Sequence, residues 1–344
     1  MQKLGIHNST QGRIVKIDLN LITAPPPFEL WSEEEKLCVD HENRPNHDYP
    51  VELFRKLPDN NEYSMLIGVG NYVICQVRPD YAPEQSFLAK YTSRPEIRHL
   101  KAIHQLMRNL LISIDNELQI GNRLPLYNRV DYHPYLLPQY LQPHTPLAVE
   151  IITFSDSSYQ NHRDDNLTQL GHMVTVDGTP IVWKSYHSHA IFKGVRDGEL
   201  SAAYGIADIP SEIEEMLAAL QLPLVGPPMI LTDSKNLCDN LNARYSCHTK
   251  RYLDKQLQYL KQSHYKGDVN VRHIPRHLNW ADPLCKNELT PAEREARDSR
   301  YFCPSDMTIH AIPNPLLSFG TASTRKVKPN TSSKRKLQQQ HPYH

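Results

Sequence analysis

Four acidic residues stand where their local sequence could bring their carboxylates to a common point. Asp156 ends an apolar run in VEIITFSDSSY, and Asp233 ends a second one in MILTDSKN. Glu199 opens the helix-like stretch GELSAAYGIA, and Asp282 lies in NWADPLCK. Carboxylate oxygens suit hard cations such as Mg²⁺, and a pair of such ions can promote hydrolysis of a phosphodiester bond. The four residues therefore predict two-metal phosphodiester hydrolysis.

Each carboxylate also has an ordinary structural interpretation. Asp282 follows Asn279, a candidate helix cap, and Glu199 lies in a first helical turn, so both could simply stabilise helix N-termini. Asp156 and Asp233 could be turn residues that follow strands. A shared site is favoured because all four occur together, each at the end of a strand or the start of a helix.

The elements that would position these residues lie between about 148 and 290. Apolar runs predict five strands, at 149–154, 171–176, 180–186, 229–232 and 269–274. The second and third strands are joined by an Asp177-Gly178 hairpin turn. Helical patterns predict helices over 198–208 and on to 220, over 251–264, and after Asn279. This order predicts an α/β fold, a mixed five-stranded sheet with flanking helices.

Other patterns occupy the rest of the chain. Residues 62–113 carry apolar residues at helical spacing, which predicts two packed helices within a smaller, mainly helical segment, 1–120. Residues 121–147 interleave proline with tyrosine, as is typical of an extended linker. Residues 291–344 are predicted to be a C-terminal extension that ends in a disordered basic tail around Arg325 to Lys336.

Composition narrows the functional classes. The 38 basic and 38 acidic residues balance, so nucleic-acid binding would have to rest on local patches. The six cysteines show no paired CxxC spacing, and no HExxH or zinc-finger spacing occurs among the histidines, which argues against a zinc protein. No apolar run near the N-terminus resembles a signal peptide or a membrane span, so we expect an intracellular protein with no membrane partner.

The acidic motifs FSDSSY, GELSAA, LTDSK and ADPLCK, in this order of elements, resemble the ribonuclease H domain of copia-type retrotransposon Pol polyproteins. Upstream, EYSMLIGVGNYVICQVRPDY and RPEIRHLKAIHQLMRNL are similar to the thumb- or connection-like end of that group's reverse transcriptase. The resemblance spans most of residues 1–290. The polymerase hairpin Tyr-x-Asp-Asp is not matched, since the only adjacent aspartates, Asp164-Asp165, lie in a polar loop. The chain therefore resembles the C-terminal portion of such a polyprotein and is not expected to polymerise DNA by itself.

This resemblance implies a ribonuclease H-like fold and hydrolysis of the RNA strand of RNA–DNA hybrids during reverse transcription. It implies that Asp156 bridges two Mg²⁺ ions, with Mn²⁺ as a substitute, that Glu199 and Asp233 hold one side, and that Asp282 completes the other. The implied partners are the hybrid and the upstream polymerase portion, in a cytoplasmic particle or the nucleus. Two histidines near the last aspartate are candidates for assisting product release, namely His273 and His277.

Six basic residues are placed near the acidic motifs where they could contact nucleic acid: Lys184, Lys193, Arg196, Lys235, Lys250 and Arg251. Each of them could equally belong to a solvated face. Two other functions stay open. The chain could be an inactive retroelement remnant that binds nucleic acid or a polymerase partner, or a metal-dependent nuclease of the same fold that acts on DNA. The position of Glu199 in an early helix argues against the DNA nuclease, because such enzymes typically carry their last acidic residue on a late helix.

Overall fold

The computed structural model describes residues 16–25, 27, 30, 32, 49–116, 118, 149–159, 167–224, 226–243, 251–286 and 288–302. The predicted linker and the predicted basic tail lie outside these residues. The described elements belong to one compact unit. None of the helices described combines the length and the apolar character that a membrane span requires.

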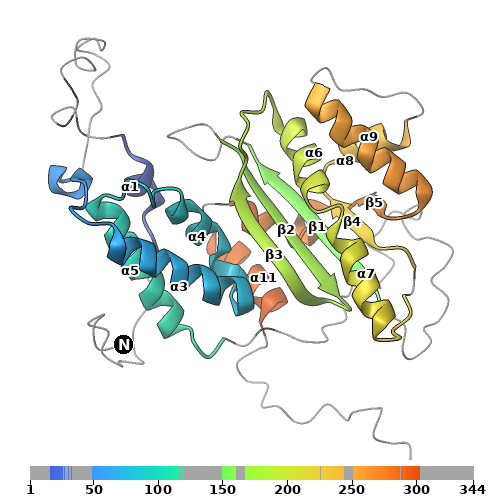
Figure 1. Ribbon diagram of the computed structural model, residues 1–344, viewed down its shortest axis with the longest axis horizontal. Coiled ribbons are helices and arrows are strands. Elements are labelled where there is room, and N and C mark those ends of the chain that lie inside the picture. The colour runs from blue at the N-terminus through green and yellow to red at the C-terminus, as the bar shows by residue number, and fades with distance from the viewer. Residues whose placement is uncertain are drawn as a thin grey trace, which may run out of the picture. The chain divides into compact units, whose positions relative to one another are not determined.

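A five-stranded mixed sheet forms the centre, with the strand order β3-β2-β1-β4-β5 (Figure 1). Its strands are β1 (Ile151–Ser158), β2 (Gln169–Val176), β3 (Thr179–His187), β4 (Met229–Thr232) and β5 (Asn270–His273). The first three strands pair antiparallel, and β1, β4 and β5 run parallel. The predicted fold class, a mixed five-stranded sheet with flanking helices, is confirmed.

The β2–β3 hairpin turns where the sequence predicts. Asp177 and Gly178 both have positive φ, 47° and 77°, as a tight two-residue turn between antiparallel strands requires. Several strand boundaries differ from the prediction by a few residues, and the largest difference is that β1 continues past the apolar run as far as Ser158. Asp156 is therefore paired within the sheet, opposite Gly171 of β2, instead of following the strand.

Helices cover both faces of the sheet (Figure 1). On one side lie α6 (Val195–Gly205), α7 (Ile209–Ala219), α8 (Lys235–Asn242) and α9 (Arg251–Lys266). Side chains from alternate strand positions, such as Ile151, Val174 and Ile230, pack beneath them. The predicted break at Pro210 is real, since α6 ends before this residue and α7 carries it in its first turn.

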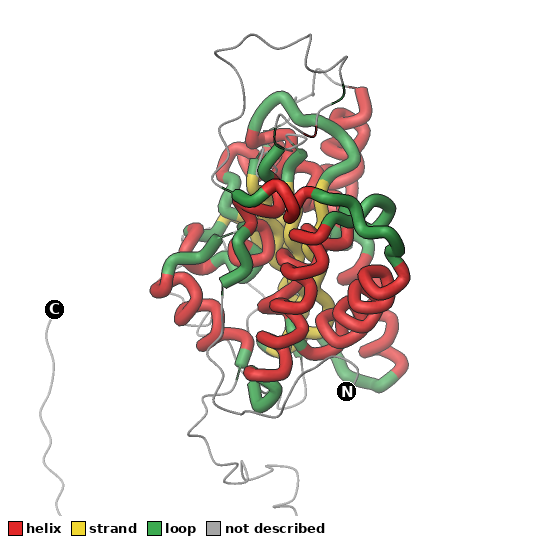
Figure 2. The backbone as a smooth tube through the Cα atoms, turned by 90° about the vertical axis from the view of Figure 1, so that its left-hand side faces the viewer, coloured by secondary structure: helices red, strands yellow, loops and turns green. Residues whose placement is uncertain are grey.

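The opposite face meets the helical segment. Its helices are α1 (Leu19–Thr23), α3 (Asn61–Val77), α4 (Ala82–Ala89) and α5 (Ile97–Ile112), and the C-terminal part adds α10 (Asp282–Cys285) and α11 (Pro291–Tyr301). Short 3-10 helices occur at Val51–Phe54, Pro79–Tyr81 and Arg276–Leu278. Figure 2 is viewed from the side of Figure 1 on which α1, α3, α4 and α5 lie, and it shows helices in front of the strands. Over residues 62–113 the sequence predicted two helices, and the structure has three, α3, α4 and α5.

The helical segment and the sheet share a single hydrophobic core. Buried residues of α3 and α5, among them Leu66 and Ile103, belong to the same cluster as Phe154 and Met173 of the sheet. Trp183 of β3 also donates a hydrogen bond of 2.9 Å to the carbonyl of Ile74 in α3. The domain boundaries stay a prediction, but the described parts on either side of the linker are packed together.

Candidate metal centre

Three of the four predicted carboxylates meet at one end of the sheet. Asp156, Glu199 and Asp233 each offer an oxygen atom, and these oxygens lie within 4.8 Å of one another. The register explains the arrangement: Ser155 of β1 pairs with Thr232 of β4 in parallel, so the next residue of each strand comes to the same place. Glu199 reaches this place from the helix that packs against β1.

A glycine permits the close approach of α6 to the sheet. A Cβ atom on Gly198 would lie 2.7 Å from Oγ of Ser157, which is shorter than ordinary contact. The same serine donates a hydrogen bond of 2.8 Å to Oε1 of Glu199. The Gly-Glu pair at 198–199 therefore lets the helix press on β1 and aims the carboxylate at Asp156 and Asp233.

Burial and mutual repulsion disfavour the charged forms of the three carboxylates. Asp156 and Glu199 are only 6% and 5% exposed. Burial, together with the charges of Glu199, Asp233 and Asp282, raises the pKa of Asp156 well above its ordinary value. Burial raises the pKa of Glu199 to about 8, and it also raises the pKa of Asp233. Within the described residues, Oε2 of Glu199 is buried without a hydrogen-bond partner.

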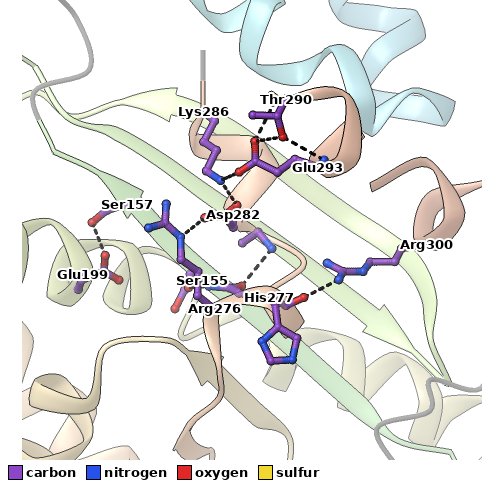
Figure 3. Close-up of polar contacts among 12 residues, drawn as sticks. Ser155, Ser157, Glu199, Arg276, His277, Asp282, Lys286, Thr290, Glu293 and Arg300 are labelled. Atoms are coloured by element: carbon purple, nitrogen blue, oxygen red, sulfur yellow. Dashed lines mark hydrogen bonds and ion pairs between the residues drawn. The ribbon is translucent and has the colours of Figure 1, made fainter. Parts of the chain in front are cut away.

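Asp282 is near this centre but is held differently. Its Oδ1 accepts from Nε of Arg276 at 2.9 Å, and its Oδ2 lies 2.7 Å from Nζ of Lys286 (Figure 3). Its charge still raises the pKa of Asp156 and Asp233. The structure thus brings together a group of three carboxylates, with the fourth beside it and paired to two cations.

Two buried residues next to the carboxylate group are Cys285 and Asn279. The Cys285 thiol is hydrogen-bonded to Asp156, and burial raises the pKa of this thiol well above its ordinary value. Asn279 is not the cap of α10 that the sequence suggested, because Ala281 holds that position. Its Nδ2 instead donates to the carbonyl of Ser155 at 3.0 Å, which fixes the loop before α10 against β1.

The two predicted histidines have different surroundings. His273 lies at the end of β5, and its charge lowers the pKa of Asp233, against the larger effect of burial. His277 lies in the 3-10 helix Arg276–Leu278, and its ring points away from Asp282 (Figure 3). Its carbonyl accepts a hydrogen bond from Arg300 of α11. Of the two, His273 is the one whose charge acts on a carboxylate of the centre.

Five of the six predicted nucleic-acid contacts are exposed side chains, and Lys250 lies outside the described residues. Lys184 lies on β3 with its Nζ 4.7 Å from the centre of the Tyr186 ring. The other four stand at or just before the first turns of helices: Lys193, Arg196, Lys235 and Arg251. They remain predicted contacts.

Sequence reasoning missed the two cations on Asp282. Lys286 stands four residues after this aspartate, a spacing at which side chains meet on a helix, so its role could have been suspected. Arg276 stands six residues before it, across a loop, and no local pattern indicates the contact. Ser157 was similarly unmarked, although it follows Asp156 by only one residue.

Comparisons with known proteins agree with the predicted resemblance. No family model matches the chain. The chain is 24% identical over 295 residues to the retrovirus-related Pol polyprotein from transposon RE1 of Arabidopsis thaliana, which covers 82% of this chain and 17% of the relative. The resemblance to a copia-type Pol polyprotein is thereby confirmed as a similarity, and the chain spans about a sixth of the length of the relative it matches.

Similar solved structures include three ribonuclease H or reverse transcriptase proteins. The N-terminal RNase H domain of Rv2228c from Mycobacterium tuberculosis is 16% identical with a TM-score of 0.30, over 44% of this chain and 96% of that one. LC11-RNase H1 in complex with RNA/DNA hybrid is 15% identical with a TM-score of 0.29, over 39% and 93%. The foamy viral protease-reverse transcriptase in complex with RNA/DNA hybrid is 14% identical with a TM-score of 0.30, over 55% and 32%.

Proposed function

We propose that this chain is the ribonuclease H portion of a copia-type retrotransposon Pol polyprotein. It hydrolyses the RNA strand of RNA–DNA hybrids during reverse transcription. The observation that carries the proposal is the meeting of the carboxylates of Asp156, Glu199 and Asp233, the first two of them buried, in a chain similar to a Pol polyprotein.

The donor set fits divalent metal ions. All three groups are carboxylates, the ligand type that Mg²⁺ prefers, with Mn²⁺ as a substitute. Burial raises the pKa of Asp156 and Glu199, and a bound cation would relieve this penalty. The unpartnered Oε2 of Glu199 leaves a ligand atom free. A merely structural acidic cluster would be expected to have its oxygens satisfied by protein donors.

Each residue has a distinct part in this proposal. Asp156, Glu199 and Asp233 would hold divalent metal together, and Asp282 would complete the set of ligands. Ser157 fixes the orientation of Glu199 through its hydrogen bond. When bound, two divalent ions supply the charge that activates a water and stabilises the leaving 3′ oxygen. His273, beside Asp233, is the better placed of the two histidines to assist product release.

The substrate and partners follow from the same proposal. The RNA–DNA hybrid would contact five exposed cations: Lys184, Lys193, Arg196, Lys235 and Arg251. The upstream polymerase portion of a Pol polyprotein is the expected protein partner, in a cytoplasmic particle or the nucleus. Support comes from the similarity to the RE1 polyprotein, of which this chain matches only a part.

A second candidate is an inactive remnant that binds nucleic acid or a polymerase partner. The observation that favours it is the double ion pair of Asp282, which would have to open before this carboxylate could hold a metal. The remnant would bind the hybrid without cutting it.

The deciding experiment is cleavage of a labelled RNA–DNA hybrid by the full chain with Mg²⁺, alongside duplex DNA. Asp233→Asn tests the centre, and Asp239→Asn is the matched control because it changes an exposed aspartate of α8 in the same way. We expect cutting of the RNA strand alone, lost in Asp233→Asn and kept in the control. Hybrid binding by a folded wild-type chain without cleavage would support the remnant instead.

A further inference from the structure

The two cations on Asp282 are held to very different degrees. Lys286 has a side chain only 17% exposed, and its Nζ also lies 2.5 Å from Oε1 of Glu293. Oε2 of Glu293 in turn accepts from the backbone N–H and the hydroxyl of Thr290, at 2.8 Å each. Lys286 is therefore part of a closed network that ties Asp282 to the first turn of α11.

Arg276 is the opposite case. Its side chain is 69% exposed, and Asp282 is its one hydrogen-bonding partner within the described part of the chain. Only Nε makes this bond, so the terminal nitrogens of the guanidinium point to no described acceptor. An ion pair this exposed contributes little stability, so a competing anion can take its place.

The backbone that carries Arg276 is nevertheless fixed. Arg300 of α11 donates to the carbonyl of His277 at 2.5 Å, and Asn279 donates to the carbonyl of Ser155 in β1. The hydrogen bond and charge of Asp282, with smaller effects of Asp156 and Asp233, raise the pKa of Arg276 above its ordinary value. A permanently charged, exposed side chain thus stands on a loop that is tied to α11 and β1, beside the carboxylate group.

We propose that Arg276 is a substrate-binding residue that exchanges Asp282 for a backbone phosphate of the nucleic acid, which frees Oδ1 of Asp282 to serve as a metal ligand. Lys286 stays on Oδ2 and positions the carboxylate. Guanidinium groups suit this exchange because their forked donors bind a phosphate with two parallel hydrogen bonds. Without nucleic acid, Arg276 competes with metal for Asp282. The proposal rests on the function proposed above and adds that substrate and the second metal position are coupled through one side chain.

The first test measures binding of an RNA–DNA hybrid in EDTA, where no cleavage occurs, by fluorescence anisotropy over a series of KCl concentrations. Arg276→Gln should weaken binding and lower the slope of log K against log salt by about 0.9, the loss of one phosphate contact. Lys286→Gln is the matched control, because it removes the other cation from the same carboxylate, and its slope should equal that of wild type. Arg276→Lys should restore the slope and part of the affinity.

The second test uses metal alone. In calorimetric titration with Ca²⁺ and no nucleic acid, Arg276→Gln should bind the ion more tightly than wild type, by at most about fivefold, because the competitor for Asp282 is gone. A damaged fold would give the opposite sign, and the melting temperature checks for it. Weaker or unchanged Ca²⁺ binding by a folded Arg276→Gln chain would overturn the exchange.

The outcomes separate this proposal from the one on which it rests. If wild type binds and cuts the hybrid while Arg276→Gln keeps the full salt slope, only the proposed role of Arg276 is contradicted. If wild type does not bind the hybrid at all, the proposed function is contradicted as well.

Discussion

The chain contains two largely buried groups of charged side chains, and they are built in opposite ways. One is the carboxylate group, formed by Asp156 in β1, Asp233 just after β4 and Glu199 in α6. The other, which we name the arginine–aspartate network, consists of Arg78, Asp80, Ser113 and Arg297, where the helical segment meets α11.

In the arginine–aspartate network, donors and acceptors match. Arg78 binds both oxygens of Asp80, at 2.9 and 2.7 Å, and also donates to the carbonyl and hydroxyl oxygens of Ser113. Its guanidinium lies over the rings of Tyr81 and Phe302, and Arg297 donates to the carbonyl of Asp80. Buried charge of this kind is tolerated because each group has its partner.

The carboxylate group lacks such partners. Like charges are gathered out of water, and one oxygen of Glu199 is left without a donor among the described residues. Such an arrangement costs stability, and it persists because the surrounding fold imposes it. The two groups therefore differ in how completely their charges are paired.

The largest expected effect comes from breaking the arginine–aspartate network. Asp80→Ala leaves Arg78 buried at 4% exposure without its carboxylate, and the free energy of unfolding should fall by about 3–5 kcal/mol. Urea denaturation measures this change. Glu62→Ala is the control, because it removes an exposed pair with His104 and should cost less than about 1 kcal/mol. Equal effects of the two substitutions would contradict the structural role of the network.

Divalent metal should stabilise the folded chain through the carboxylate group and not through the arginine–aspartate network. With Mg²⁺ at about one hundred times its dissociation constant, the fold should gain about 2.7 kcal/mol. Thermal unfolding with MgCl₂, compared with KCl of matched ionic strength, measures the gain. It should persist in Glu62→Ala and disappear in Glu199→Gln. A gain that survives Glu199→Gln would place the metal elsewhere.

Neutralising a member of the carboxylate group should stabilise the metal-free chain. Asp156→Asn removes one of several repelling charges, so the free energy of unfolding should rise by about 1–2 kcal/mol, opposite in sign to Asp80→Ala. Denaturation in EDTA tests this, with Asp239→Asn as the matched neutralisation at an exposed position. A loss of stability in Asp156→Asn would mean that the charge is compensated after all.

The smallest effect is a dependence on pH. Because the pKa of Glu199 is raised to about 8 in the fold, the folded state binds more protons than the unfolded chain between that pH and about 4.5. Stability of the metal-free chain should therefore rise as pH falls through this window, by about 1 kcal/mol from pH 8 to 7. Unfolding of wild type and Glu199→Gln across pH measures the difference.

A buried histidine gives the opposite trend and must be separated from this effect. Burial, together with the charge of Lys184, lowers the pKa of His172 to about 3, so its contribution to stability is lost as pH falls below about 6.5. In Glu199→Gln the rise should be smaller than in wild type, and the remainder belongs to Asp156 and Asp233, whose pKa values burial also raises. A stability profile for Glu199→Gln that rises from pH 8 to 7 as steeply as that of wild type would contradict the assignment to Glu199.

The sequence by itself determined the five strands and the acidic residues. Apolar runs and the Asp177-Gly178 turn predicted the sheet, because alternation and turn chemistry are local properties of the chain. The order of the motifs indicated that Asp156, Glu199 and Asp233 belong together, and the structure places them within reach of one metal ion.

Only the tertiary structure decided how these charges are balanced. Arg297 reaches Asp80 from 217 positions away, and Arg276 reaches Asp282 across a loop, so neither contact leaves a periodic signal in the sequence. The same holds for Gly198, whose missing Cβ matters only because Ser157 lies against it. Local patterns fix which residue types occur in each element, whereas the pairing of buried charges depends on which distant elements pack together.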